Sequence, residues 1–304
     1  MEERRIRTWV EEFLAYCRVN GRAEATIVYH RSCLKRFAKW CKTRNVETIE
    51  QVDRKLIRDY WGFLLDNYKG VTSAARSVRA FFNWLDAEGE LTDNPVTRAG
   101  FPKKQQETIQ PLTPQEIQKL LDAARRGRNG RRDSALILWL YDTGLRVSEA
   151  ARLRIRDVDF NHGQATVRRK GGKTGTVVFS YRTARAVRTY LRKDRAGANE
   201  YEELFVTDEG LPLDRFNIRS ILQRAAKRAG MEPSRVSPHK LRHSFAVAFL
   251  RNGGSALHLQ AMLGHSTLDM TKRYVAFSGH DFREAHKRFS PVLRMGRQDD
   301  DDDW

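Results

Sequence analysis

The sequence has few cysteines, only three among 304 residues. Cys17, Cys33 and Cys41 are odd in number and lack C-x-x-C spacing, which argues against a disulfide framework or a cysteine-rich zinc site. We therefore expect all three to be small core residues on helices.

Long apolar runs are also missing, since no stretch approaches the length of a membrane span. The first residues, Met1–Ile6, are mostly charged and lack the apolar core of a signal peptide. Both absences predict a soluble, cytoplasmic protein that does not have a membrane as its partner.

The sequence contains no internal repeat, no glycine-rich phosphate loop and no metal-binding motif. His239 and His243 have the spacing of zinc ligands, but no third ligand accompanies them.

Positive charge, in contrast, is in excess: the formal net charge is +18 and the pI is about 10.1. Such a field attracts polyanions, and nucleic acid is the first candidate. An anionic membrane surface would require an amphipathic basic helix with an exposed apolar face, which we do not find.

Apolar residues in the first third of the chain recur at helical spacing. Asp53 fits the N-cap of one such helix. Basic residues on the outer faces, among them Arg76 and Arg79, are candidate DNA contacts, although such charges often serve solvation alone. Four helices are expected, at residues 4–19, 26–44, 53–67 and 72–87, and their short connections predict a compact all-α bundle.

A linker and a clear helix start follow this bundle. The linker contains Gly, Pro and polar residues without periodicity, and it adds Lys103 and Lys104 as candidate DNA contacts. Thr113 then fits an N-cap, with Pro114 at N1 and Glu116 at N3, so a second domain begins here.

Four segments follow from this division. An acidic run near the end of the chain, Asp299–Asp303, predicts a disordered tail. The predicted segments are a helical domain at 1–98, a linker at 99–111, a second domain at 112–290 and the acidic tail at 291–304.

The second domain combines helices with one small sheet. Residues 134–141 are apolar on nearly all sides and predict a buried helix, which Gly144 ends in the left-handed conformation. Residues 165–169 and 176–180 predict two strands joined by a two-residue Gly-Gly turn, with Lys170 at the tip. Further helices are expected at about 183–193, 214–229, 238–251, 255–263, 267–275 and 282–289. The fold class is therefore mainly α with a small β-sheet.

The helix start at Ser237 is the first functional candidate. Ser237 fits the N-cap and Pro238 the N1 position, so His239 and Arg242 lie on one face of the first turn. An imidazole and a permanent cation at a helix start suit a phosphate. This pair is a weak signal alone, but it accompanies Thr-Gly-Leu-Arg146-Val-Ser-Glu, Lys170 with Lys173 nearby, Leu-Gly-His265 and Tyr274.

Cutting a phosphodiester by nucleophilic attack needs these residue types. Two arginines can stabilise charge on the non-bridging oxygens, because their donors fork to match phosphate. A lysine such as Lys170 can protonate the leaving 5′ oxygen, and histidines can move protons. A tyrosine such as Tyr274 can attack and leave a covalent phosphotyrosine, which preserves the bond energy for rejoining.

Together and in this order, the motifs resemble the tyrosine recombinase (phage-type integrase) family. The resemblance is strong over about 112–290 as an α+β catalytic domain, and by architecture the bundle resembles the family's core-binding domain. It implies a site-specific DNA recombinase with no metal and no cofactor. The implied partners are double-stranded DNA with inverted-repeat sites and further copies of the chain, forming a tetramer. The implied roles are nucleophile for Tyr274, phosphate binding for Arg146 and Arg242, general acid for Lys170, and assistance by His239 and His265.

Each residue also has a simpler interpretation. Arg146 fits an ion pair with Glu149 at a helix end, and Lys173 is a rival of Lys170 at the hairpin. His265 fits a cap beside Ser266, and Tyr274 fits a core tyrosine. At the level of the whole protein, the alternatives are DNA relaxation of the type IB topoisomerase kind and a DNA-binding protein with a relic site.

The biological role is less defined. The segments around Tyr274 and from Phe282 to Pro291 favour an integrase of a mobile element, and the alternative is a Xer-type resolvase of chromosome or plasmid dimers. The helix expected at 282–289 is a candidate for coupling neighbouring subunits, because Phe282 and Phe289 lie on one face. Docking on its own domain is the other interpretation.

Overall fold

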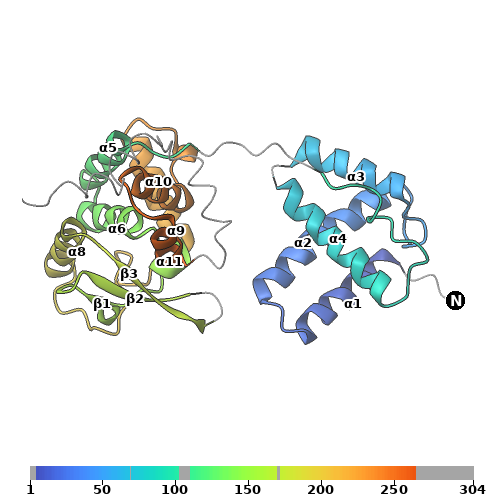
Figure 1. The fold of residues 1–304 in the computed structure, drawn as a ribbon, viewed down its shortest axis with the longest axis horizontal. Helices are drawn as coiled ribbons and strands as arrows, with labels where there is room; N and C mark the ends of the chain where they lie inside the picture. Colours follow the sequence, from blue (N-terminus) through green and yellow to red (C-terminus); the bar gives the residue numbers. More distant parts are fainter. Residues whose placement is uncertain (1–4, 69, 103–109, 170–171, 265–304) are drawn as a thin grey trace, which may run out of the picture. The chain divides into compact units, whose positions relative to one another are not determined.

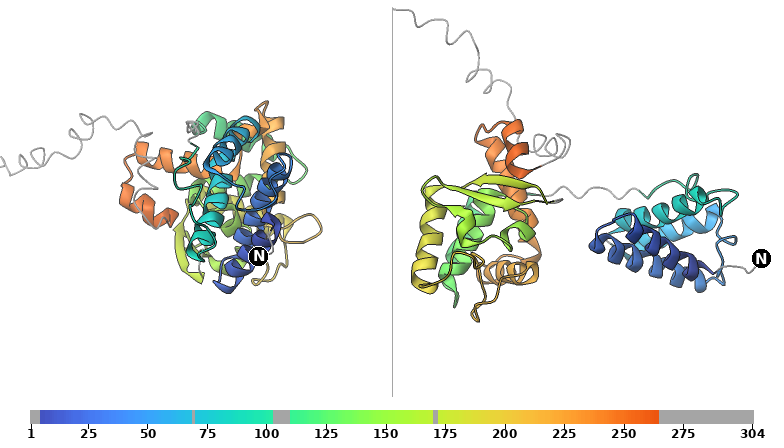
Figure 2. Two further views of the ribbon diagram at one scale, coloured as in Figure 1. Left: turned by 90° about the vertical axis from the view of Figure 1, so that its right-hand side faces the viewer. Right: turned by 90° about the horizontal axis from the view of Figure 1, so that it is seen from below.

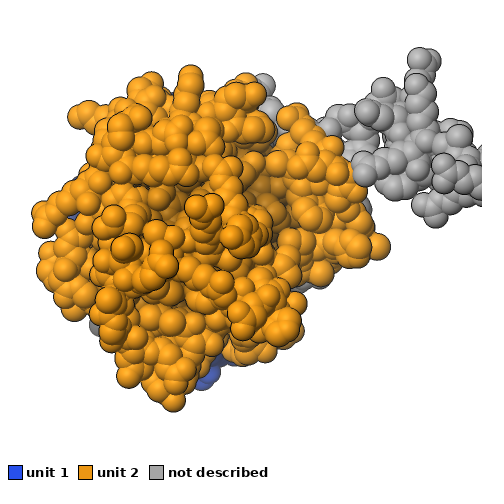
Figure 3. All heavy atoms as spheres, turned by 90° about the vertical axis from the view of Figure 1, so that its left-hand side faces the viewer, with its two compact units in different colours: residues 1–108 blue, residues 109–304 orange. Residues whose placement is uncertain are grey.

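The computed structural model describes residues 5–68, 70–102, 110–169 and 172–264. The chain divides into two compact units, unit 1 at Met1–Thr108 and unit 2 at Ile109–Trp304, which Figure 3 colours separately. Three of the predicted catalytic residues, Lys170, His265 and Tyr274, lie outside the described residues, as do the candidate DNA contacts Lys103 and Lys104. The predicted helices at 267–275 and 282–289 and the acidic tail also lie outside them.

Unit 1 is the predicted bundle of helices (Figure 1). Asp53 is the N-cap of the third helix, where its side chain accepts a 2.7 Å hydrogen bond from the backbone N–H of Leu56. The three cysteines are buried, unpaired helix residues, as predicted. The helices are α1 (Ile6–Val19), α2 (Glu24–Lys42), α3 (Arg54–Asn67) and α4 (Val71–Ala87).

Aromatic side chains form much of the core of unit 1. Phe37 packs edge-on against Tyr60 and Phe82, with ring centroids 5.0 and 5.8 Å apart. All three rings are fully buried. Edge-to-face packing of this kind adds about 0.5–1.5 kcal/mol per pair beyond the area buried.

Unit 2 begins with the predicted capping box. Thr113 accepts from the Glu116 backbone N–H, and the Glu116 carboxylate accepts from the Thr113 backbone N–H. Within its described residues, unit 2 has the helices α5 (Pro114–Arg125), α6 (Gly130–Thr143), the single turn α7 (Val147–Ala150), α8 (Tyr181–Asp194), α9 (Arg215–Arg228), α10 (Pro238–Arg251) and α11 (Ala256–Leu263), with short 3₁₀ turns at Ile155–Asp157 and Pro233–Arg235.

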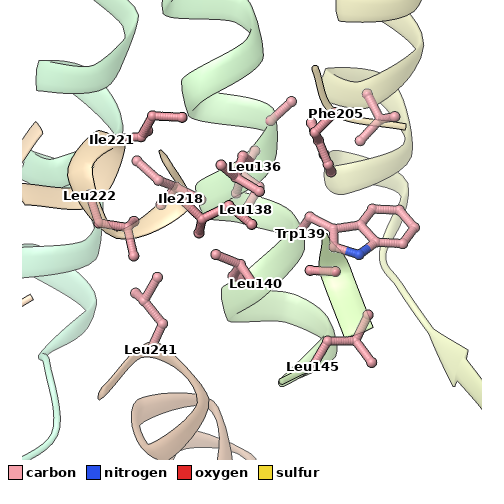
Figure 4. Close-up of a cluster of buried hydrophobic side chains, with 14 of the residues drawn as sticks. Leu136, Leu138, Trp139, Leu140, Leu145, Phe205, Ile218, Ile221, Leu222 and Leu241 are labelled. Carbon is pink, nitrogen blue, oxygen red and sulfur yellow. The ribbon is translucent and has the colours of Figure 1, made fainter. Parts of the chain in front are cut away.

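Helix α6 lies at the centre of unit 2, as the apolar run at residues 134–141 predicts. Its Trp139 is fully buried and packs against Phe179 and Phe205, with ring centroids 4.8 and 6.4 Å apart. In Figure 4, isoleucine and leucine side chains of α9 and Leu241 of α10 meet the other side of α6. Helix α6 contacts α5, α8 and α10, so neighbouring helices surround it.

A three-stranded antiparallel sheet lies beside this helical core (Figure 2). The strands β2 (Gln164–Arg168) and β3 (Thr174–Val178) confirm the predicted hairpin, but each is shifted from its expected bounds. The predicted two-residue turn is wrong: the Arg169 backbone N–H donates to the Lys173 carbonyl at 2.7 Å, so three residues connect the strands. The short β1 (Val158–Asp159) was not predicted, because two residues carry no periodicity. The fold class, mainly α with a small sheet, is confirmed.

Candidate active site

The segment after α6 fixes the first candidate residue, Arg146. Gly144 caps α6 in the left-handed conformation, with φ of +60°, as predicted. The Thr143 hydroxyl donates to the Trp139 carbonyl at 2.7 Å and accepts from the Leu145 backbone N–H at 3.3 Å. These bonds set a tight turn that delivers Arg146 to the N-cap of α7.

Arg146 forms the ion pair with Glu149 that the sequence offered as its simpler interpretation. Its Nη1 is 2.9 Å from Glu149 Oε1, and its backbone N–H donates to Glu149 Oε2 at 2.9 Å. The Arg146 side chain is 40% exposed, whereas that of Glu149 is 6% exposed. The buried carboxylate therefore orients a guanidinium that keeps solvent-facing donors, an arrangement suited to an incoming phosphate.

Arg242 is held very differently, although it lies on the predicted helix start. Ser237 is the N-cap of α10 and accepts from the Lys240 backbone N–H at 3.2 Å. One turn on, Arg242 is buried, and it donates from Nη1 to the Gly144 carbonyl at 2.7 Å and from Nη2 to the Leu263 carbonyl at 2.9 Å. This one side chain therefore joins the end of α6, α10 and the end of α11.

His239 lies on the first turn of α10 with an exposed edge. Partial burial lowers the pKa of His239 below its usual value, and the positive charge of Arg242 lowers the pKa further. The ring is therefore neutral at neutral pH, so it can accept a proton or donate one hydrogen bond.

The hairpin contributes a residue that the sequence did not single out, Arg169. Its Nη1 and Nη2 donate to the carbonyls of Ala261 and Met262, at 3.2 and 2.9 Å. These are carbonyls of the last turn of α11. Arg169 was missed because its partners are backbone groups 92 and 93 residues away, and no side-chain motif marks them.

The candidate DNA contacts within the described residues are exposed. Arg76 and Arg79 lie on α4 at a spacing of three, and the Arg79 guanidinium is 6.0 Å from the centre of the Phe101 ring. Lys173, at the start of β3, is exposed beside Thr174. All three side chains are accessible to a polyanion.

Among residues 5–68, 70–102, 110–169 and 172–264, no group of three or more His, Cys, Asp or Glu side chains is placed to hold a metal ion. No helix within those ranges is long and apolar enough to cross a membrane. A hollow of about 890 Å³ lies between α8 and the turn before β2, lined by Arg185, Arg188 and Arg192 among others. Of the predicted catalytic residues that the structure describes, Arg146, His239 and Arg242, none lines this hollow.

Comparison with known proteins identifies the family. Residues 110–280 match the family model described as the phage integrase family, and residues 10–89 match the phage integrase N-terminal SAM-like domain. The chain therefore belongs to the phage integrase family of tyrosine recombinases, and it is a site-specific recombinase.

Relatives cover nearly the whole chain. It is 31% identical over 296 residues to tyrosine recombinase XerC of Oceanobacillus iheyensis, covering 94% of this chain and 97% of the relative. It is 29% identical over 294 residues to tyrosine recombinase XerD of Staphylococcus aureus, covering 94% and 99%. Its fold is similar to that of the Tn1549 transposon integrase in complex with a circular intermediate DNA, with a TM-score of 0.76 at 19% identity over 96% and 99% of the two chains.

Proposed function

We propose that this recombinase cleaves and rejoins double-stranded DNA through a 3′-phosphotyrosine formed by Tyr274. In this proposal Arg146 and Arg242 bind the scissile phosphate and Lys170 is the general acid, while His239 and His265 assist. The observation that carries it is the pair of hydrogen bonds from Arg242 to the Gly144 and Leu263 carbonyls. These two bonds bring the segment that contains Arg146 beside the start of α10. They also place Leu263, at the end of α11, beside both.

The chemistry balances without an added reactant. The Tyr274 oxygen attacks phosphorus, a tyrosyl–phosphate bond forms and the bond from phosphorus to the 5′ oxygen breaks. A proton passes to that leaving oxygen, and the reverse attack by a 5′ hydroxyl rejoins the strand and releases Tyr274. Since phosphate ester bonds are conserved in number, the reaction needs no external energy source.

In this proposal, the three described catalytic residues act on the scissile phosphate in different ways. Arg146, with its exposed guanidinium oriented by Glu149, is the group best placed to reach a non-bridging oxygen. Arg242 supplies positive charge from a buried position while its donors hold neighbouring backbone. His239, neutral at neutral pH, is suited to a hydrogen bond that strengthens as charge develops.

The domain roles and assembly belong to the same proposal. Residues 1–98 form a core-binding domain that contacts DNA with Arg76 and Arg79, joined by a linker at 99–111 with Lys103 and Lys104 to the catalytic domain at 112–290. Strand exchange needs two duplexes held together, so four subunits assemble on paired inverted-repeat sites. Lys173 at the hairpin is a further candidate DNA contact. A recombinase works where its DNA substrate lies, which keeps the cytoplasm as the predicted location.

Two biological roles are compatible with this chemistry. Integration or excision of a mobile element is one, and the similarity of fold to a transposon integrase supports it. Resolution of chromosome or plasmid dimers is the other, and the near full-length similarity to XerC and XerD supports it equally well. The two roles differ in substrate: the first joins or releases an element, and the second converts a dimer into monomers with one site each.

The test is a plasmid assay with sites recovered by binding selection from random DNA. On a supercoiled plasmid carrying two sites, recombinant circles support the proposal, relaxed circles alone indicate topoisomerase activity, and retardation alone indicates a binding protein.

Tyr274→Phe keeps the ring and removes only the hydroxyl, so DNA binding is expected to persist while the covalent adduct on a denaturing gel disappears. An adduct formed by Tyr274→Phe contradicts the assignment.

A further inference from the structure

Arg169 makes the last pairing of the β2–β3 ladder and, with its side chain, reaches a different element. Its backbone N–H donates to the Lys173 carbonyl at 2.7 Å. Its guanidinium donates to the Ala261 and Met262 carbonyls of α11 at 3.2 and 2.9 Å. The end of the hairpin and the end of α11 are therefore joined through one residue.

Two glycines make room for this side chain. A Cβ at Gly175 of β3 would lie 2.3 Å from Arg169 Nε, and a Cβ at Gly264 would lie 1.7 Å from Arg169 Nη1. Neither distance is tolerated between real atoms, so the guanidinium occupies space that only glycine leaves. The Arg169 side chain can therefore take this position only because residues 175 and 264 are glycines.

The carbonyls it meets lie at the end of α11, where that of Ala261 also accepts a 3.1 Å hydrogen bond from the Gly264 backbone N–H. The last carbonyls of a helix have no partner within it and carry the negative end of the helix dipole, which a guanidinium complements. Ala261 and Met262 accept from Arg169, and the next carbonyl, Leu263, accepts from Arg242 at 2.9 Å. Two arginines from separate elements thus hold three successive carbonyls of α11.

We infer that Arg169 is a positioning residue for the cleavage step: it fixes the hairpin end against the end of α11. This inference rests on the proposed function, in which Lys170 protonates the leaving oxygen and His265 assists. Lys170 follows Arg169 directly in the chain, and His265 directly follows Gly264. Fixing Arg169 against the end of α11 restricts where the side chain of Lys170, the general acid, begins.

A purely stabilising residue and a positioning residue differ in one measurable respect. Loss of stability lowers the amount of active protein equally for every substrate. Loss of positioning of a general acid slows cleavage only where the leaving atom needs a proton. Sulfur in place of the 5′ bridging oxygen leaves as a thiolate without a proton, so it separates the two cases.

The experiment measures single-turnover cleavage of oxygen and sulfur substrates by folded protein at saturating concentration. Arg169→Ala is expected to slow oxygen cleavage about 10- to 100-fold, since a misplacement of about 1 Å costs on the order of 100-fold. With the sulfur substrate its rate is expected within about 3-fold of wild type by the same argument. Arg169→Lys, which reaches one carbonyl, is expected to recover part of the oxygen rate, and Arg168→Ala, an exposed neighbour, is the unchanged control.

Gly175→Ala gives an independent test without removing Arg169. The three atoms nearest to its added Cβ all belong to Arg169, so the substitution displaces that side chain. It is expected to slow oxygen cleavage in the wild-type background and to have no further effect when combined with Arg169→Ala.

Three results overturn the inference: full oxygen cleavage by Arg169→Ala, equal slowing with oxygen and sulfur, or additive effects with Gly175→Ala. Lys170→Ala distinguishes the two levels of failure. If sulfur rescues Lys170→Ala but not Arg169→Ala, only the positioning role is wrong. If sulfur does not rescue Lys170→Ala, the proposed general acid is wrong and the inference fails with it.

Discussion

The start of α7 and the first turn of α10 each present one arginine, and the surrounding chain uses the two in opposite ways. Arg146 is 40% exposed and is held by one carboxylate, that of Glu149. Arg242 is buried and itself holds two backbone carbonyls, those of Gly144 and Leu263. Two residues with the same proposed task on phosphate therefore differ in what the fold requires of them.

This difference separates catalysis from stability. A guanidinium that is held by its surroundings can be removed at modest cost to the fold, whereas one that holds its surroundings leaves unpaired backbone groups behind. Variants of the two arginines should therefore differ in their free energy of unfolding, even if both lose DNA cleavage.

Arg242→Ala carries the largest expected effect. It removes two hydrogen bonds from a charged donor, each worth about 1.5–3 kcal/mol, so the free energy of unfolding should fall by about 3–6 kcal/mol. Urea unfolding followed by circular dichroism measures this fall. Arg219→Ala, an exposed arginine of α9, is the matched control and should stay within about 0.5 kcal/mol of wild type. A loss from Arg242→Ala no greater than the control's would show that these bonds do not support the fold.

The local elements of this comparison were predictable, and the contacts between them were not. Periodicity and capping residues located α5, α6 and α10, because their caps Thr113, Gly144 and Ser237 act within one turn of chain. The inward direction of Arg242 was hidden because its carbonyl partners lie 98 and 21 residues away and every residue type has a carbonyl. The hairpin register failed for a related reason: two adjacent glycines suit several turn lengths.

The recombinase family was accessible from sequence because its motifs are made of rare combinations of side chains. The pairing of Arg146 with Glu149 was also foreseen, as the two residues lie one helical turn apart. Sequence could not show that this pair leaves the guanidinium exposed, since exposure depends on what packs around the turn. The proposed roles of all six catalytic residues, Arg146, Lys170, His239, Arg242, His265 and Tyr274, stay predictions.

Gly144→Ala tests the link between the two regions, because Gly144 precedes Arg146 and its carbonyl binds Arg242. An added Cβ would lie 2.5 Å from Phe245 Cδ1 and 2.8 Å from Leu263 Cδ2. We expect a loss of about 1–2 kcal/mol from the left-handed backbone and about 1–3 kcal/mol more from overpacking. Thermal unfolding measures the sum.

Gly230→Ala is the control for this variant. Gly230 also has a positive φ, +69°, after the end of a helix, but an added Cβ would meet nothing within 4 Å. It should show the backbone cost alone. If the two variants lose equal stability, α10 and α11 can shift to accommodate the added Cβ at Gly144. The packing around Gly144 would then not couple the Arg146 and Arg242 regions.

Arg146→Ala is expected to cost less stability than Arg242→Ala but to abolish most cleavage. It leaves one oxygen of the buried Glu149 carboxylate without its partner, a cost of about 1–3 kcal/mol. Adding Glu149→Gln removes the buried charge and should restore much of that stability. Cleavage should stay reduced on the order of 100-fold or more, as for loss of one transition-state donor. If the double variant recovers both properties, Arg146 serves only its ion pair.

The smallest expected effect comes from a third arginine, Arg235, which pairs at the surface rather than in the core. Its Nε is 2.8 Å from Glu116 Oε1, with both side chains roughly a quarter to a third exposed, at 30% and 25%. The hydrogen bond from Arg235 is the main cause that lowers the pKa of Glu116, and burial opposes it. Because the folded pKa is lowered, the pair stabilises the protein fully above the usual carboxyl range and loses this effect as pH falls through the folded pKa.

Glu116→Gln keeps the capping box but removes the charge, so it should cost about 0.5–1 kcal/mol at pH 7. Denaturant unfolding of both proteins from pH 7 downward should show this difference shrinking towards zero in acid. A difference that stays constant across that range would show that the loss comes from altered capping rather than from the ion pair.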